Sequence, residues 1–504
     1  MVLALHVLAW VLAHGIADTN LDGYADMLEN FAWGQNWAWG SAKHPPLFAW
    51  VTGTWFQFLP HLDVSYHLLS YLNVALALFG VYKVAQAMER PDLALPSTLL
   101  LCLAFPYSTL AVKFNANAIL LSAWPWVVLA WVRCVTSQGR AGLVWSVCLG
   151  FISALSMLGK YYSGVFLLAI FLSSLASANG RRWFGTYKPW LTLAVFGVCL
   201  LPHLMWLQDH AWVTLRYVGE QGGDNGVSWP MVLKFAVSPL AYWLLPWLLC
   251  TWVYAPEGSL NQRLRAWPAR LLRSWLPHGW DDTLFWIAML PWMITLIFGI
   301  SGFVELSLPW AIPIGYGFSL LWLRNLSQAP RASSLALTQL CKCFLAWCLL
   351  VVLVSPWYAW HQAQNATPNH YLPRREAAQA LLATWQARYP NHTLRWVGGQ
   401  WAENALLSFY GNPNLRVVPG VPDEFPATVT PLEGWQQQAG LLLCPMGPLA
   451  HPEPSSCEAD MRHWLTQQGQ TPEAIELTIA SQGLRFPLHI PFAYIAFAYL
   501  PPRP

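Results

Sequence analysis

The sequence predicts a polytopic α-helical membrane protein with about eleven transmembrane helices and a C-terminal soluble α/β domain. Hydrophobic residues make up 56% of the 504 residues and charged residues only 10%, whereas an ordinary soluble protein carries about 25% charged residues. Long apolar runs recur up to residue 357, and the composition then becomes that of a soluble domain. We therefore expect a membrane part at residues 1–358 and an α/β domain at 359–504.

Charge and aromatic content narrow the class further. The formal charge of +3 is small, and the chain has no run of basic residues that would indicate a nucleic-acid partner. The 33 tryptophans are typical of a protein with many side chains at the membrane–water interface. These features predict a lipid bilayer, and not a nucleic acid, as the partner of the first 358 residues.

The apolar runs predict the individual helices. The first run resembles a secretory signal peptide, but it lacks a basic N-terminal region, so a first transmembrane helix is the better interpretation. The expected helices are 1–16, 62–84, 94–112, 116–133, 143–158, 161–178, 190–207, 232–254, 283–301, 309–324 and 335–357. The loop at 255–282, with four arginines and several tryptophans, is expected to be an amphipathic segment on the cytoplasmic leaflet.

The distribution of basic residues orients these helices. With the N-terminus inside, fourteen lysines and arginines lie in cytoplasmic loops or at cytoplasmic helix ends, and five lie on the opposite face. An odd number of helices then places the C-terminal domain on the non-cytoplasmic side of the membrane. The five outward-facing cations are Lys43, Lys113, Lys160, Arg216 and Lys234. Such residues either extend to the interface or bind an anion.

The C-terminal part has the alternating pattern of a small α/β domain. Helices are expected at 374–390, 402–411 and 458–469, and strands at 394–399, 415–420, 441–445 and within 475–500. Gly398-Gly399 is not a dinucleotide-binding motif, because G-x-G-x-x-G is absent. An oxidising compartment would allow a Cys444–Cys457 disulfide, and the sequence leaves the bonded and the free states open.

An acidic segment follows the first apolar run. The first outer loop, residues 17–61, contains Asp18, Asp22, Asp26 and Glu29, followed by Lys43-His44-Pro45-Pro46. Charged side chains at a membrane are costly unless they are used there. We therefore expect this loop to form one side of an active site on the non-cytoplasmic face.

This loop resembles the corresponding loop of GT-C glycosyltransferases, and most closely that of the protein-O-mannosyltransferase-like and aminoarabinose-transferase-like enzymes (glycosyltransferase family 39-like). The resemblance rests on Tyr24-Ala25-Asp26, Trp39-Gly40 and His44-Pro45-Pro46-Leu47, and continues at Gly159-Lys160-Tyr161-Tyr162 and Pro202-His203-Leu204-Met205-Trp206. It covers about residues 1–325 and implies an inverting transfer from a polyprenyl-phosphate-linked sugar, with a loop carboxylate as general base. The acceptor is a lipid such as lipopolysaccharide, a glycan or a protein.

Carried over residue by residue, the resemblance makes Asp26 the candidate base. Asp22 stays an alternative, because it lies four positions earlier and would share a helical face with Asp26. Many family members have Asp-Glu at this point, whereas here Met27 follows Asp26. Displacing a phosphate requires a base and cations that stabilise the leaving group. The expected substrate-binding residues are Glu29, Lys43, His44, Lys160, Tyr161, His203 and Arg216.

Several alternatives stay open. Asp18 and Asp22 are also typical helix N-caps, and Asn115 and Asn117 are expected to pair with backbone groups at a tight turn. A transporter or flippase of a lipid-linked substrate is the second function, although the sequence lacks the internal symmetry that such proteins show. A structural assembly subunit is the third. No cofactor is expected, and although a divalent metal is compatible with the chemistry, the outer carboxylates form no metal motif.

Overall fold

The computed structural model describes residues 1–18, 20–22, 25–220, 226–255, 258–327, 330–365, 372–399, 401–418, 434–448, 456–480 and 491–501. The chain divides into two compact units. The first contains Met1–Trp10, Lys43–Leu47 and Ser70–Val351, and the second contains Val11–Ala42, Phe48–Leu69 and Val352–Pro504. The second unit thus combines most of the first outer loop with the C-terminal domain.

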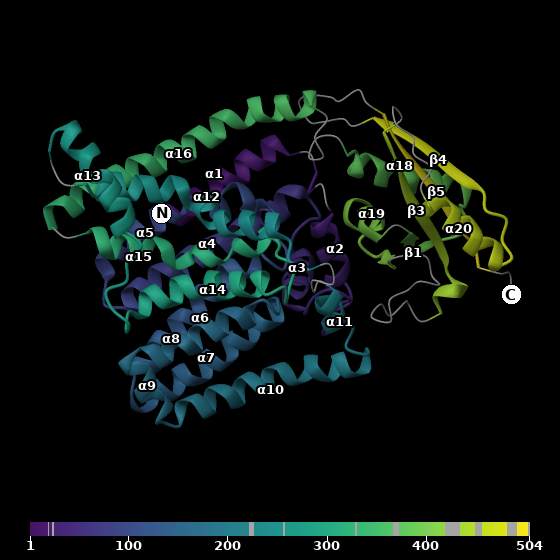
Figure 1. Ribbon diagram of the computed structural model, residues 1–504. Helices are drawn as coiled ribbons and strands as arrows, with labels where there is room; N and C mark the ends of the chain where they lie inside the picture. The colour runs from purple at the N-terminus through teal and green to yellow at the C-terminus, as the bar shows by residue number, and fades with distance from the viewer. Residues whose placement is uncertain are drawn as a thin grey trace. The chain divides into compact units, whose positions relative to one another are not determined.

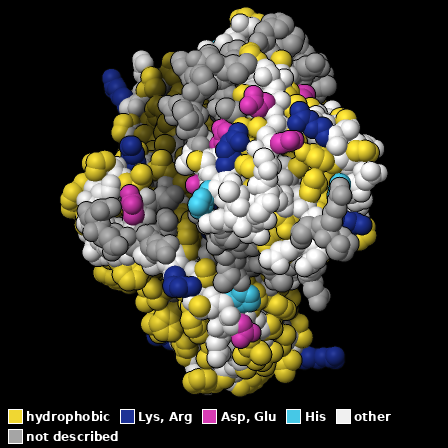
Figure 2. All heavy atoms as spheres, turned by 90° about the vertical axis from the view of Figure 1, so that its right-hand side faces the viewer, with side chains coloured by type: hydrophobic (Ala, Val, Ile, Leu, Met, Phe, Trp, Pro, Cys, Tyr) yellow, Lys and Arg dark blue, Asp and Glu magenta, His cyan; other side chains and the backbone are white. Residues whose placement is uncertain are grey.

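Long apolar helices dominate the membrane part, and seven of those described are long and apolar enough to cross a bilayer. They are α4 (Asp63–Ala87), α6 (Ile119–Thr136), α7 (Gly139–Gly159), α10 (Lys188–Asp209), α12 (Trp229–Val253), α14 (Thr283–Ile300) and α16 (Pro330–Gln364). In the first unit α7 packs between α6 and α10 (Figure 1). Hydrophobic side chains cover the bottom of Figure 2, at the level where α10 lies in Figure 1, as expected of a lipid-facing surface.

Two further spans are bent. The first joins α5 (Pro91–Leu101) to the short helices η1 (Phe105–Tyr107) and η2 (Thr109–Val112) at an angle of 84°. The second joins α8 (Ser163–Ala176) to α9 (Ala178–Phe184) at 101°. Counting each as one span raises the total to nine among the described residues.

The remaining two of the eleven expected ranges are helical but short. Range 1–16 is α1 (Val2–Ala17), an apolar helix of 16 residues. Range 309–324 consists of η3 (Leu308–Ala311), η4 (Ile314–Gly317) and α15 (Phe318–Leu326). Proline and glycine interrupt this range, because proline removes a backbone donor and glycine disfavours a regular helix. The expected amphipathic segment is α13 (Leu260–Arg273), and none of its side chains is buried.

Two short helices of the second unit form the outer loop. They are α2 (Asp26–Gly34) and α3 (Leu47–Phe58). A Cβ atom on Gly34 would lie 2.6 Å from the carbonyl oxygen of Ala49, and one on Gly53 would lie 2.6 Å from that of Gly34. Only glycine permits this close crossing of the two backbones.

The C-terminal domain contains a five-stranded mixed sheet in the order β2-β1-β3-β5-β4 (Figure 1). β1 pairs in parallel with β2 and β3, while β5 pairs antiparallel with β3 and β4. The strands are β1 (Leu394–Gly399), β2 (Arg416–Val417), β3 (Ala439–Pro448), β4 (Ala474–Ala480) and β5 (Pro491–Tyr499), and the helices are α18 (Arg374–Arg388), α19 (Trp401–Leu406), continued by a π-helical turn η5 (Leu407–Gly411), and α20 (Ser456–Gln467). The expected small α/β domain is therefore present, with every predicted strand and helix represented.

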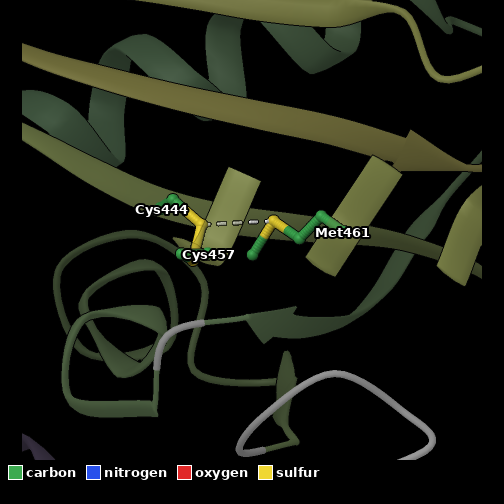
Figure 3. The surroundings of a disulfide bond; sticks show 3 residues. All are labelled: Cys444, Cys457 and Met461. Carbon is green, nitrogen blue, oxygen red and sulfur yellow. Dashed lines mark hydrogen bonds between the residues drawn. A yellow bond between two sulfur atoms is a disulfide. The ribbon is translucent and has the colours of Figure 1, made fainter. Parts of the chain in front are cut away.

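A disulfide joins the sheet to α20. Cys444 of β3 is bonded to Cys457 of α20, and the Met461 sulfur lies 3.4 Å from that of Cys444 (Figure 3). Cys444 and Met461 belong to the hydrophobic core of the domain, together with Trp396, Trp464 and Phe497. The bond therefore fixes α20 onto this core.

We expect Cys444→Ser to destabilise the C-terminal domain by about 2–4 kcal/mol, because the bond restricts the unfolded chain. The detergent-solubilised variant should unfold at a lower Tm than the wild type. A reductant should lower the Tm of the wild type by a similar amount. Cys343→Ser, at a free cysteine of α16, is the control and should leave the reductant effect intact. A wild-type Tm that does not respond to reductant would contradict the prediction.

Candidate functional site

Lys160 is the centre of a cationic cluster in the first unit. It directly follows α7, and its Nζ donates a hydrogen bond of 2.6 Å to Oδ1 of Asn117, in the turn before α6. The same ammonium lies 5.8 Å from the centre of the Trp310 ring. The amide and the aromatic face help to hold the Lys160 ammonium in place.

His44 belongs to the same cluster. Its ring is 6.1 Å from that of Tyr217 in α11 (Val213–Glu220) and meets it edge-on. Burial lowers the pKa of His44 well below 6.5, and the positive charges of Lys160 and Lys43 lower it further. His44 is therefore neutral at pH 7, and Lys43 and Lys160 provide the positive charge.

We expect the depressed pKa of His44 to make folding pH-dependent. Above pH 6.5 the ring is neutral in both the folded and the unfolded chain, whereas below it the unfolded chain alone takes up the proton. Relative to His44→Gln, the wild type should therefore lose about 1.4 kcal/mol for each pH unit below 6.5. Thermal unfolding of both proteins between pH 5 and 8 measures this, and a wild-type-to-variant difference that stays constant over the range would contradict it.

Tyr161 and His203 are brought together by α7, α8 and α10. The Tyr161 hydroxyl and Nε2 of His203 share a hydrogen bond of 2.6 Å, and the hydroxyl also hydrogen-bonds to Thr214 of α11. The His203 side chain is buried. Arg216, two residues after Thr214 on α11, is exposed to solvent. The two sequence motifs at 159–162 and 202–206 thus meet at the ends of their helices.

The acidic residues of the outer loop belong to the second unit and have distinct environments. The Asp22 carboxylate accepts hydrogen bonds from the backbone N–H groups of Asp26 (3.1 Å) and Met27 (2.8 Å), at the start of α2. Asp22 therefore caps α2, as the alternative interpretation expected. Asp26 is the first residue of α2 and partly exposed, and Glu29 is buried one turn later.

The backbone before Asp26 is held in an uncommon conformation. Ala25 has φ of 57°, in the left-handed region that costs a non-glycine residue about 1–2 kcal/mol. Strain of this kind concentrates at functional sites, where the surrounding structure enforces it. Here the Asp22 cap and the buried Ala25 side chain fix the direction in which α2 begins.

Within the second unit, the C-terminal domain makes hydrogen bonds and an ion pair with residues of this loop and with Asp63. The fully buried Arg374, the first residue of α18, donates from Nη1 to the Asp22 carbonyl oxygen, and Asn20 donates to that of Leu372 at 3.3 Å. Arg375 pairs with Asp63 at 2.6 Å, and the Tyr410 hydroxyl donates to the same carboxylate at 2.7 Å. The sequence predicted α18 but not these contacts.

The predicted residues are divided between the two units. Lys43, His44, Lys160, Tyr161, His203 and Arg216 belong to the first unit, and Asp22, Asp26 and Glu29 to the second. That the two groups face a single cleft stays a prediction. Among the described residues, no group of three or more histidine, cysteine, aspartate or glutamate side chains is arranged to hold a metal ion.

The two asparagines expected to pair with backbone groups, Asn115 and Asn117, have different outcomes. Asn115 caps the turn, accepting from the N–H groups of Asn117 and Ala118, and this confirms its expected backbone role. Asn117 instead binds Lys160. The sequence signal for this was weak, since an asparagine in a turn usually satisfies backbone groups.

Parts of the sequence match a known protein family and a characterised protein. Residues 43–206 match the sequence model of the dolichyl-phosphate-mannose-protein mannosyltransferase family. The lipopolysaccharide core galacturonosyltransferase RgtB of Rhizobium johnstonii is 26% identical over 216 residues, which cover 40% of this chain and 41% of that protein. The chain therefore matches less than half the length of this curated relative.

The fold is similar to a solved structure along nearly its whole length. ArnT from Cupriavidus metallidurans bound to undecaprenyl phosphate matches with a TM-score of 0.59 and 14% identity, over 99% of this chain and 97% of that one. Its apo form matches with a TM-score of 0.58, 14% identity, and coverage of 98% and 97%. The likeness covers the helical part and the C-terminal sheet domain alike.

Proposed function

We propose that this chain is a GT-C membrane glycosyltransferase that transfers a sugar from a polyprenyl-phosphate donor to an acceptor hydroxyl. The family match at residues 43–206, the similarity to RgtB and the ArnT-like fold support this proposal. The acceptor is lipopolysaccharide or another lipid, a glycan or a protein. The reaction takes place on the outer face of a bacterial inner membrane, where the C-terminal domain is periplasmic. The observation that carries this proposal is the cluster of Lys43, His44 and Lys160, in which two lysines provide positive charge beside a neutral histidine, within the range that matches the family model.

The proposed chemistry is a single displacement. The acceptor oxygen attacks the anomeric carbon, the bond from that carbon to the phosphate oxygen breaks, and the phosphate leaves with the electron pair. Asp26 takes the proton of the acceptor hydroxyl, and attack opposite the leaving group inverts the anomeric carbon. Lys43 and Lys160 stabilise the charge that develops on the phosphate, and Arg216 can bind a phosphate through two N–H groups.

The environments of the two aspartates support this assignment. Both carboxylate oxygens of Asp22 already accept backbone hydrogen bonds at the start of α2, so they are engaged in capping that helix. Asp26 follows the strained Ala25 and remains partly exposed. We therefore assign the base to Asp26 and the orientation of α2 to Asp22.

A reconstituted assay tests the function against transport. Proteoliposomes receive a polyprenyl phosphate carrying a radiolabelled sugar, together with cell-envelope lipopolysaccharide, and the products are separated by extraction and mass spectrometry. A new glycosidic bond on the acceptor, with release of polyprenyl phosphate, is the expected result. Labelled donor that crosses the membrane unchanged, with no new bond, would instead identify a flippase.

The contacts of the C-terminal domain predict that it supports catalysis. Arg374→Met removes the hydrogen bond to the Asp22 carbonyl oxygen, and an unpaired buried group costs about 1–3 kcal/mol. Because that bond holds the residue that caps α2, we expect kcat to fall about tenfold or more, with KM for the donor nearly unchanged. The transfer assay under saturating donor measures both constants.

Arg375→Met is the matched control, because Arg375 is the next residue and pairs with Asp63 instead. It should retain most of the wild-type kcat. If Arg374→Met is folded and fully active, the C-terminal domain has only a docking role. Deletion of the whole domain is less informative, since it would also expose the packed side of the loop.

A further inference from the structure

The second unit contains a pocket that is separate from the carboxylates of α2. Its volume is about 380 Å³, within the range of about 300–1,000 Å³ typical of small-molecule sites. It lies between the end of α2, the end of α3 with His61, and the segment that leads into β2. Its lining includes Phe31, Gln35, Trp37, Phe56, Leu415 and Arg416.

The pocket combines an apolar base with a polar rim. Phe31, Phe56 and Leu415 are buried, and the close crossing of Gly34 and Gly53 brings α2 and α3 together beneath it. The Trp37 side chain is 46% exposed. Its backbone has φ of 50°, in the left-handed region that is unfavourable for a bulky residue. A large aromatic face presented in this way packs well against the C–H groups of a ring.

Gln35 lines the pocket and carries an acceptor oxygen without a hydrogen-bond partner among the described residues. Its Nε2 donates to Oγ of Ser408 at 2.6 Å and to the carbonyl oxygen of Pro413 at 3.0 Å. The Pro413 carbonyl can only accept, so the amide orientation is fixed. Oε1 is then buried without a hydrogen-bond partner among the described residues, and an unpaired buried acceptor is costly. A ligand hydroxyl would satisfy it.

Arg416 is the only charged residue among the lining residues. Its Nη1 donates to the carbonyl oxygen of Gln35 at 3.1 Å and to Oδ1 of Asn36 at 2.7 Å, which holds the guanidinium at the rim. Among the described residues its Nε and Nη2 make no hydrogen bond, and they remain available for an anion. A ligand that matches these residues has hydroxyl donors, an apolar ring face and one negative charge. An acidic sugar has all three.

We propose that this pocket is an acceptor subsite that binds an acidic sugar unit of a saccharide acceptor, which rests on the proposed transferase function. The subsite adjoins the C-terminal end of α2, while Asp26 begins that helix. Nine residues of α-helix span about 13 Å, so the bound unit lies away from the reacting hydroxyl. The pocket therefore selects the acceptor and takes no part in bond formation.

Saturation-transfer NMR on the full chain in lipid nanodiscs tests the proposal without turnover. The probes are methyl β-D-glucuronide and its neutral counterpart, methyl β-D-glucoside. We expect the glucuronide to bind more tightly, Trp37→Ala to weaken both probes at least fivefold, and Arg416→Gln to weaken the glucuronide alone at least fivefold. Arg416→Lys, which keeps the charge, should preserve the preference for the acid.

Arg395→Gln and Trp280→Ala are the matched controls, because both side chains are exposed and do not line the pocket. Both should bind the probes as the wild type does. Failure of the glucuronide to bind the wild type, or unchanged binding to folded Trp37→Ala or Arg416→Gln, would overturn the proposal. Asp26→Asn should bind the probes normally, so loss of transferase activity and loss of this site can be told apart.

Discussion

Asp26→Asn should abolish sugar transfer, with kcat reduced about 10³-fold or more and the protein still folded. The asparagine side chain has nearly the same shape but cannot take the proton of the acceptor hydroxyl, and general-base catalysis contributes about 10²–10⁴-fold. Asp26 is partly exposed and asparagine keeps its size, so stability should change little. Initial rates at saturating donor, together with the Tm, measure the two effects separately.

Asp22→Asn distinguishes the two candidate bases. Asparagine keeps one acceptor oxygen for the N–H groups that Asp22 now binds, so we expect a loss of about 0.5–2 kcal/mol of stability and a smaller loss of rate than for Asp26→Asn. Glu305→Gln, at an exposed carboxylate of the first unit, is the neutral control. An inactive Asp22→Asn beside an active Asp26→Asn would move the base to Asp22. Activity in both would remove the loop carboxylates from the mechanism.

Lys160→Met should reduce kcat/KM for the donor about 10²-fold, the usual consequence of removing one group that stabilises transition-state charge. The substitution deletes the ammonium while methionine retains most of the apolar side chain, so contact with Trp310 is largely kept. The hydrogen bond to Asn117 is lost. Both kcat and donor KM should change, because a phosphate carries negative charge before and during the displacement.

Lys160→Arg should recover part of the activity, since it restores the charge with a different geometry. Lys234→Met is the matched control, because Lys234 lies exposed on α12 and an exposed lysine contributes little to stability. Wild-type kinetics in Lys160→Met, or an equal loss in Lys234→Met, would show that Lys160 has no specific role at the phosphate.

Element positions were largely predictable from local patterns. The ranges of α7, α10 and α14 were predicted to within a few residues, because a span must be apolar throughout to satisfy a bilayer. The strands β1 and β3 were also predicted, because each is a short run of strand-forming residues next to glycine or proline. The bends within α5–η2 and α8–α9 were not, because a uniform apolar run does not reveal where a helix changes direction.

The contacts of the candidate site residues were only partly predictable from the sequence. The sequence indicated Lys160 through its motif, but not the contact with Asn117, because 43 residues separate them. The sequence also left two roles open for Asp22, general base or helix cap. Its two hydrogen bonds to backbone N–H groups of α2 now favour the cap. Partners distant in the chain depend on how helices pack, and no local pattern records that.

The sequence by itself determined the class of protein, the positions of its apolar helices, the α/β domain and the motif residues, because hydrophobicity and local spacing suffice for each. Only the tertiary structure decided that the outer loop forms one compact unit with the C-terminal domain, that Arg374 binds the Asp22 backbone, and that a pocket with Arg416 at its rim lies in that unit. These contacts join residues about 350–380 positions apart. They exist because packing of the folded chain, and not any local preference, brings those side chains together.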